Sequence, residues 1–190
     1  EQNSQEEAFQ QMDYAVERGI NFFDTAELYS VMPRKETYGK TEEIIGNWFQ
    51  HKKNRKDIIL ASKIASKSEG LEWIRKGSKY LGFDKTNFND AIDQSLKRLK
   101  TDYIDLYQLH WPERKGPKFG VLDFEYDPSD QDWTPIEQVL DNLQDLINSG
   151  KKTHFIFSLI NYLIILLIIL DLTRPRIIDS KVDKNIEICL

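Results

Sequence analysis

The chain has 190 residues, and its 31 acidic and 26 basic side chains give a net charge of −5. This length fits one domain with a substantial core, or part of a larger single domain such as a barrel of about 250 residues. The basic residues form no block, which argues against nucleic acid or an anionic membrane surface as a partner. The single cysteine, Cys189, permits no internal disulfide, so we predict a reducing compartment and a cytoplasmic location.

The spacing of apolar residues predicts four helices. The first spans residues 4–18, where Ser4 and Glu7 form a capping box. The second spans about 40–50, and the third covers the helical period in residues 88–99. The fourth covers residues 134–150.

The fourth helix has the clearest local signals. Thr134 is its predicted N-cap, Pro135 is expected at the first helical position, and Glu137 completes a capping box. The predicted buried stripe consists of Ile136, Val139, Leu140, Leu143, Leu146 and Ile147.

Three short apolar runs predict strands at residues 21–23, 58–62 and 103–109. They alternate with the helices and carry no hairpin signal, so we expect a parallel α/β fold. The pattern alone leaves an open doubly wound sheet and a closed eight-stranded barrel as alternatives. A dinucleotide-binding GxGxxG and a phosphate-binding P-loop are both missing from the sequence, which disfavours the corresponding nucleotide-binding folds.

Polar side chains stand where each predicted strand ends. Asp24, Lys63 and His110 end the three strands, and Tyr29 lies five positions beyond Asp24. Because the carboxyl ends of parallel strands meet at one rim, we expect the four side chains to converge. An acid, a lysine, a tyrosine and a histidine at one rim predict a proton-transfer site.

Each of these residues has a plausible role. A tyrosine hydroxyl is a weak acid near neutral pH unless a nearby cation stabilises its anion, and Lys63 would supply that cation for Tyr29. Asp24 would hold the lysine, and His110 would orient a substrate carbonyl or help to pass the proton. The structural alternative is an ordinary ion pair at the rim, with His110 as a loop histidine and Asp24 as a cap or turn former.

Three segments of the sequence resemble the aldo-keto reductase family. They are GINFFDTAELY from Gly19, ASK at residues 61–63, and SLKRLKTDYIDLYQLHWP at residues 95–112. With GKTEEIIGNWF, their spacing is most similar to the Tas-like branch, and residues 1–150 match in order. The resemblance implies a (β/α)8 TIM barrel, truncated here to roughly its first half, and NADPH-dependent reduction of an aldehyde or ketone.

The resemblance also implies a catalytic tetrad of Asp24, Tyr29, Lys63 and His110. Tyr29 would be the general acid as a hydride moves from the nicotinamide to the carbonyl carbon, and Asp24 would also contact the cofactor. Trp111 follows the histidine as in this branch, where it would line the substrate pocket or simply pack. A small-molecule carbonyl compound is the implied partner.

The match stops after residue 150. The family continues with a strand of the type IRYIGVSN, whereas this chain reads SGKKTHFIFSLINYLIILLIIL. Residues 151–190 include ten Ile, seven Leu and no Gly or Ala, a composition that A+T-rich codons produce. We therefore predict that 1–150 is a partial reductase domain and that 151–190 is read out of frame or is a fragment end. The first residue, Glu1, also indicates that the true start is missing.

A membrane anchor is another interpretation of this tail. An anchor at residues 155–170 is disfavoured, because 16 helical residues span about 24 Å, against a hydrocarbon core of ~30 Å.

The missing second half would supply much of the cofactor site, so we expect the truncated chain to be impaired or inactive. The functional alternatives are a noncatalytic binding or regulatory module of the same fold and an inactive fragment with a membrane-associating tail.

Overall fold

The computed structural model describes most of the first 157 residues. All of them belong to the first of two units into which the chain divides, Glu1–Ser158. The predictions for residues 158–190, including most of the apolar segment 155–170 and Cys189, lie outside the described residues. The described ranges are 3–68, 70–75, 81–115, 125, 127–150 and, for the backbone alone, 152–157.

The four predicted helices are confirmed. They are α1 (Gln5–Glu17), α2 (Lys40–Lys52), α3 (Lys85–Leu99) and α4 (Ile136–Asn148), with short 3-10 turns at Arg55–Asp57 and Glu72–Ile74. The capping box of α1 forms as predicted: the Glu7 amide donates to Ser4 Oγ over 3.2 Å, and the Ser4 amide donates to Glu7 Oε2 over 2.7 Å. Within the described part of the chain, no helix is both long and apolar enough to cross a membrane.

The predicted start of α4 is wrong. Pro135 is the N-cap, no side chain caps the helix, and Thr134 lies outside it. The reason is a competing partner, because the Thr134 amide and hydroxyl donate to the Glu113 carboxylate over 2.7 and 3.2 Å. The Thr134 backbone and side chain are thus directed to Glu113, and the helix begins without a side-chain cap.

The predicted apolar stripe of α4 is only half buried. Val139, Leu143 and Leu146 are in the core. Ile136, Leu140 and Ile147 are exposed instead, because only one side of the helix meets the core cluster.

The strands form one parallel sheet in the order β1-β2-β3-β4. This order follows the chain without a reversal, as in an arc of a barrel and unlike a doubly wound sheet. Two details differ from prediction: β2 continues through Lys63 to Ile64, and the fourth strand was not predicted because it falls in the apolar tail. The strands are β1 (Phe22–Asp24), β2 (Ile59–Ile64), β3 (Ile104–Leu109) and β4 (Lys152–Phe157).

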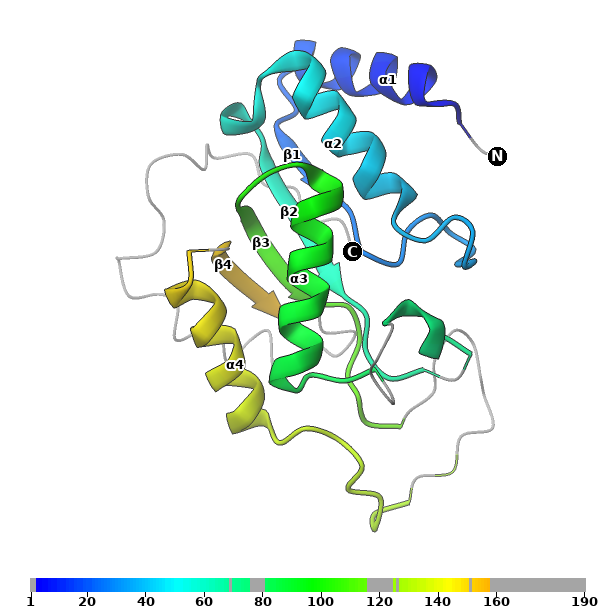
Figure 1. Ribbon diagram of the computed structural model, residues 1–190, viewed down its shortest axis with the longest axis vertical. Coiled ribbons are helices and arrows are strands. Elements are labelled where there is room, and N and C mark those ends of the chain that lie inside the picture. The colour runs from blue at the N-terminus through cyan, green and yellow to red at the C-terminus, as the bar shows by residue number, and fades with distance from the viewer. Residues whose placement is uncertain are drawn as a thin grey trace. The chain divides into compact units, whose positions relative to one another are not determined.

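Helices α2, α3 and α4 cover one face of the sheet (Figure 1). Leu60 and Ile64 of β2 point into the core between this face and the helices. Side chains alternate along a strand, so Lys63 and Ala61 must face the opposite side. The register pairs Asp24 with Ala61 and Lys63 with Gln108, which brings the polar side chains of three strands to that opposite face.

Gly46 allows α2 and α3 to approach closely. A Cβ at this position would lie 2.2 Å from the Arg98 carbonyl oxygen and 2.7 Å from the Leu99 carbonyl carbon, and backbone atoms cannot move aside cheaply. This contact fixes α3 against α2, and α3 in turn leads into β3.

We predict that Gly46→Ala lowers the free energy of unfolding by about 1–3 kcal/mol, because the added methyl group overpacks the helix contact. Urea unfolding followed by circular dichroism measures the change. Gln50→Ala, at an exposed position of the same helix, is the control and should stay within about 0.5 kcal/mol of the unchanged chain. Equal stability of the two variants would contradict the close contact.

Candidate functional site

Lys63 is the buried charge at the carboxyl end of the sheet. It is 6% exposed, and its ammonium group donates to Asp24 Oδ2 over 2.5 Å and to the Thr25 carbonyl oxygen over 2.9 Å. The carboxylate partner is less buried, since the Asp24 side chain is 44% exposed. A buried ammonium requires such a partner, because an unpaired charge would carry a large desolvation penalty.

Gln108 holds the second oxygen of Asp24. Its side-chain amide donates to Asp24 Oδ1 over 2.8 Å, so the two carboxylate oxygens are oriented by two different strands. The sequence interpretation did not include Gln108. The signal was present, because Gln108 stands two positions before His110 and strand periodicity puts both on one face.

Tyr29 and His110 complete the cluster. The Lys63 ammonium lies 5.1 Å from the centre of the Tyr29 ring, within the range of a cation–π contact. The Tyr29 and His110 rings meet edge to face with their centres 5.7 Å apart. The structure thus brings Asp24, Tyr29, Lys63 and His110 together, as the sequence predicted.

The His110 ring is held neutral. Burial, the largest cause, and the nearby Lys63 charge together lower its pKa to about 4, against the opposing effect of Asp24. Its Nδ1 atom is buried and has no hydrogen-bond partner among the described residues. A neutral imidazole beside a lysine and a tyrosine can accept or donate one hydrogen bond to a bound polar group.

Trp111 is a core residue here. It is 4% exposed and packs in a second apolar cluster with Leu28, Ala65 and Ile74, and its indole N–H donates to the Lys67 carbonyl oxygen over 3.1 Å. Its ring also contacts His110, with 4.8 Å between the ring centres. These contacts favour a packing role for Trp111 over a place in the substrate pocket. The Trp111 ring also supports the His110 ring.

A groove of about 1160 Å³ opens beside Asp24. It runs between α1, residues 30–37 and the start of α2. The sheet contributes Phe23 and Asp24 to its lining. The exposed side of the Asp24 carboxylate can therefore be reached by a ligand.

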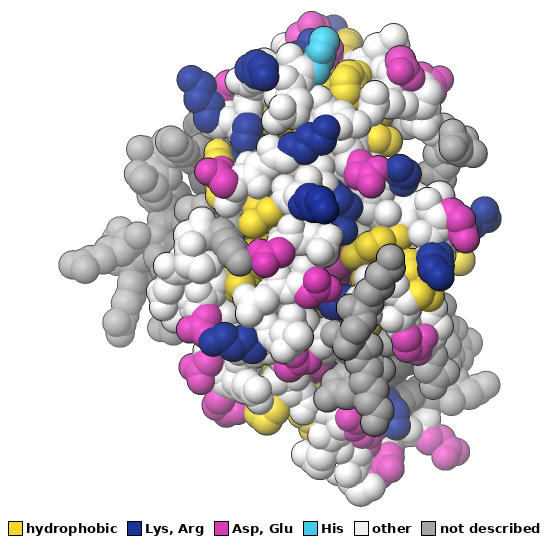
Figure 2. All heavy atoms as spheres, in the orientation of Figure 1, with side chains coloured by type: hydrophobic (Ala, Val, Ile, Leu, Met, Phe, Trp, Pro, Cys, Tyr) yellow, Lys and Arg dark blue, Asp and Glu magenta, His cyan; other side chains and the backbone are white. Residues whose placement is uncertain are grey.

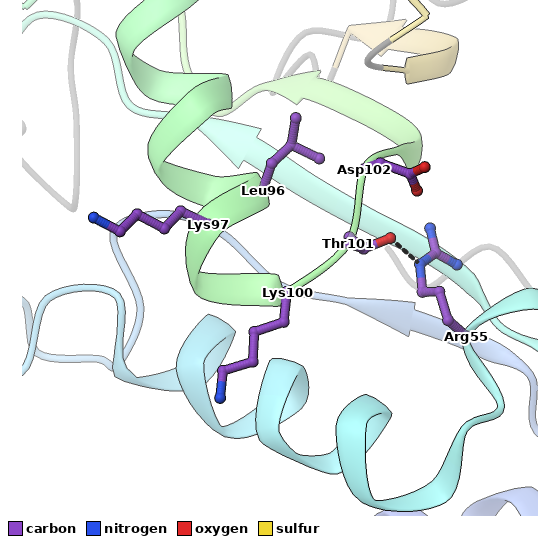
Figure 3. A pocket seen from close by; sticks show the side chains of 6 residues that line it. All are labelled: Arg55, Leu96, Lys97, Lys100, Thr101 and Asp102. Carbon is purple, nitrogen blue, oxygen red and sulfur yellow. Dashed lines mark hydrogen bonds between the residues drawn. The ribbon is translucent and has the colours of Figure 1, made fainter.

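A second hollow lies at the opposite, amino-terminal end of the strands (Figure 3). Arg55 is its most notable side chain, but the guanidinium group is already committed: it donates to Thr101 Oγ1, to the carbonyl oxygens of Ile58 and Tyr103, and to the Asp105 carboxylate. Lys97 and Lys100 also line the hollow, and their side chains extend away from Arg55 in Figure 3. The hydrogen bonds of Arg55 at this hollow connect the segments that precede β2 and β3. The hollow is separate from the cluster around Lys63.

The face drawn in Figure 2 carries mixed charge. Lysine and arginine side chains are interspersed with aspartate and glutamate over it (Figure 2). Among the described residues, no group of three or more His, Cys, Asp or Glu side chains is arranged to hold a metal ion.

We predict that His110 titrates with a midpoint near pH 4, well below its ordinary value of 6.5. Between about pH 6.5 and 4, His110 stays neutral in the folded chain but binds a proton in the unfolded chain. The free energy of unfolding should therefore fall as the pH decreases over this range. The ring ¹³Cε1 chemical shift, assigned with a His110→Gln variant, gives the midpoint, and urea unfolding gives the stability. A midpoint close to 6.5 would contradict the burial of this ring beside Lys63.

Comparison with known proteins identifies clear relatives. The family model described as "Aldo/keto reductase family" matches residues 1–163. The chain is 43% identical to Protein tas of Escherichia coli over 146 residues, which is 77% of this chain and 40% of that protein. It is also 43% identical to an aldo-keto reductase of Babesia bovis over 104 residues, covering 52% and 36% of the two chains.

A further relative is norsolorinic acid reductase B of Aspergillus parasiticus, 34% identical over 148 residues, or 78% of this chain and 32% of that protein. The chain thus spans about two fifths of the length of the bacterial relative it matches. The family match covers all four strands of the sheet and every residue of the cluster around Lys63, and it extends beyond residue 150, where the resemblance was predicted to stop. The chain therefore belongs to the aldo/keto reductase family.

Proposed function

We propose that the cluster of Asp24, Tyr29, Lys63 and His110 is the proton-transfer centre of an NADPH-dependent reductase that converts an aldehyde or ketone to an alcohol. The observation that carries this proposal is the position of Tyr29 between a buried ammonium and a neutral histidine ring. Family membership supports oxidoreductase chemistry on a carbonyl compound.

Tyr29 is the proposed proton donor. As the carbonyl oxygen gains negative charge, the Tyr29 hydroxyl transfers its proton to that oxygen, and Lys63 stabilises the phenolate that remains. Asp24 and the Thr25 carbonyl oxygen keep the ammonium in place during this step.

His110 is the proposed orienting group. A neutral imidazole can hydrogen-bond the carbonyl oxygen without competing with Tyr29 as an acid. The unpartnered Nδ1 atom and the exposed side of Asp24 fit a polar ligand group at this rim. When bound, the nicotinamide supplies the hydride that reaches the carbonyl carbon. Asp24 is the described residue proposed to contact it, because its carboxylate lies beside Lys63 and its side chain is 44% exposed.

The whole reaction is a proposal for this chain, because the chain spans about two fifths of the bacterial relative. The closed eight-stranded barrel, the preference for NADPH over NADH and the cytoplasmic location remain predictions. The relative from Aspergillus parasiticus is called a reductase, which agrees with the proposed direction of the reaction.

We predict that Tyr29→Phe lowers the rate of carbonyl reduction by at least ~100-fold, because the variant lacks the general acid. The purified chain is mixed with excess NADPH and 4-nitrobenzaldehyde, and the decrease of the cofactor absorbance at 340 nm gives the rate. The unchanged chain should reduce the aldehyde slowly but above the background of the Tyr29→Phe variant.

The matched control is Tyr14→Phe, which removes the hydroxyl of an exposed tyrosine on α1. Its rate should equal that of the unchanged chain. Equal rates for Tyr29→Phe and Tyr14→Phe above the protein-free background would show that Tyr29 is not the proton donor. No rate above that background in the unchanged chain would favour a noncatalytic binding module or an inactive fragment.

A further inference from the structure

Glu27 is a fully buried acid in the segment that connects Asp24 to Tyr29. It is 0% exposed, and it lies three residues after Asp24 and two residues before Tyr29. The proposed reaction gives it no role. A buried carboxylate on a short segment of the site needs an explanation, because burying it is costly unless it is well paired.

The Glu27 carboxylate accepts from three donors on three segments. Oε1 accepts from the Ala65 amide over 2.6 Å and from Arg75 Nη2 over 2.5 Å. Oε2 accepts from the Tyr38 hydroxyl over 3.1 Å. The three donors come from the loop after β2, from the end of the turn Glu72–Ile74 and from the approach to α2.

The backbone of the same segment runs beside β2. The Thr25 amide donates to the Ala61 carbonyl oxygen over 2.9 Å, and the Glu27 amide donates to that of Lys63 over 3.2 Å. Glu27 therefore binds the chain just after the Lys63 side chain, through its amide to the Lys63 carbonyl oxygen at the end of β2 and through its carboxylate to the amide of Ala65 in the following loop. The chain then turns, with the Tyr29 amide donating to the Ala26 carbonyl oxygen over 3.1 Å.

The charges and protons of this group are consistent with a fixed arrangement. Arg75 is 2% exposed and supplies the positive charge that balances Glu27. Burial raises the pKa of the Tyr38 hydroxyl well above its usual range, and the Glu27 charge raises it further. Tyr38 thus stays a donor to Glu27 at any pH at which the enzyme would operate.

We propose that Glu27 is a positioning residue that sets where Tyr29 lies relative to Lys63 and His110. It ties the segment before Tyr29 to the strand that carries Lys63, and Arg75 and Tyr38 hold its carboxylate in place. The functional consequence of this inference rests on the proposed role of Tyr29 as proton donor, whereas the geometric consequence does not.

The chain contains a matched comparison in Glu42. This residue is also 0% exposed and is paired with an arginine, since Arg98 Nε donates to Glu42 Oε2 over 2.7 Å. Its other contact is the Ser62 hydroxyl. Glu42 therefore joins α2 to α3 and β2, and no hydrogen bond or ion pair that it makes in the described structure involves the segment from Asp24 to Tyr29.

The experiment compares Glu27→Gln with Glu42→Gln in the full chain. The readout that does not depend on turnover is the nuclear Overhauser effect between the Tyr29 and His110 rings, whose centres are 5.7 Å apart. We expect this effect in the unchanged chain and in Glu42→Gln, and its disappearance or marked weakening in Glu27→Gln. The second readout is aldehyde reduction, where kcat of Glu27→Gln should fall about 10- to 100-fold with KM within threefold.

The outcomes separate the two proposals. If the unchanged chain reduces no aldehyde, the proposed function fails, while a nuclear Overhauser effect that disappears in Glu27→Gln alone still supports positioning. A folded Glu27→Gln variant that keeps the effect overturns the positioning role. If Glu27→Gln does not fold, Tyr38→Phe replaces it, because that change removes only one donor to Glu27. A weakened effect between the two rings in Tyr38→Phe then supports the role, and an unchanged effect overturns it.

Discussion

The buried ammonium of Lys63 is the constraint on which the site depends. A charge with 6% exposure is tolerated only beside a carboxylate and further acceptors, so β1 must present Asp24 at the matching level of the sheet. A shift of one residue in the register would turn Asp24 or Lys63 toward the helices and leave a charge unpaired in the core. The ion pair between Lys63 and Asp24 therefore depends on the parallel register of the strands.

Two buried acid–arginine pairs surround this centre and connect its elements. Glu42 and Arg98 join the helical layer to β2, and Glu27 and Arg75 join the segment after β1 to the loops that follow β2. Tyr38 lies between them, because its hydroxyl donates to Glu27 and the Arg98 guanidinium lies 4.9 Å from its ring centre. Removing one partner of such a pair costs more than the pair contributes, since the other charge stays buried. The two pairs therefore favour this packing of the helical layer, β2 and the segment after β1 over arrangements that would leave a buried charge unpaired.

The sequence was informative where the signal is local or periodic. The capping box of Ser4, the parallel α/β order and the convergence of Asp24, Lys63 and His110 all follow from spacing and strand ends. The cap of α4 was mispredicted because Thr134 binds Glu113, a contact between residues 21 apart that no local pattern reveals. Glu27 was not identified from the sequence for the same reason. Its partners Tyr38, Ala65 and Arg75 are far apart in the chain and meet only in the folded structure. The fourth strand was missed because its sequence lies in an apolar tail without alternation.

The most direct test of this account is the Lys63 ammonium itself. In ¹⁵N-labelled protein, ammonium protons of exposed lysines exchange rapidly with water near neutral pH, whereas a buried group held by Asp24 and the Thr25 carbonyl oxygen should exchange slowly enough to be detected. We expect an ammonium signal that persists near neutral pH, disappears in Lys63→Met and is absent or strongly broadened in Asp24→Asn. A spectrum with no signal that depends on Lys63 would contradict the buried ion pair and the site built around it.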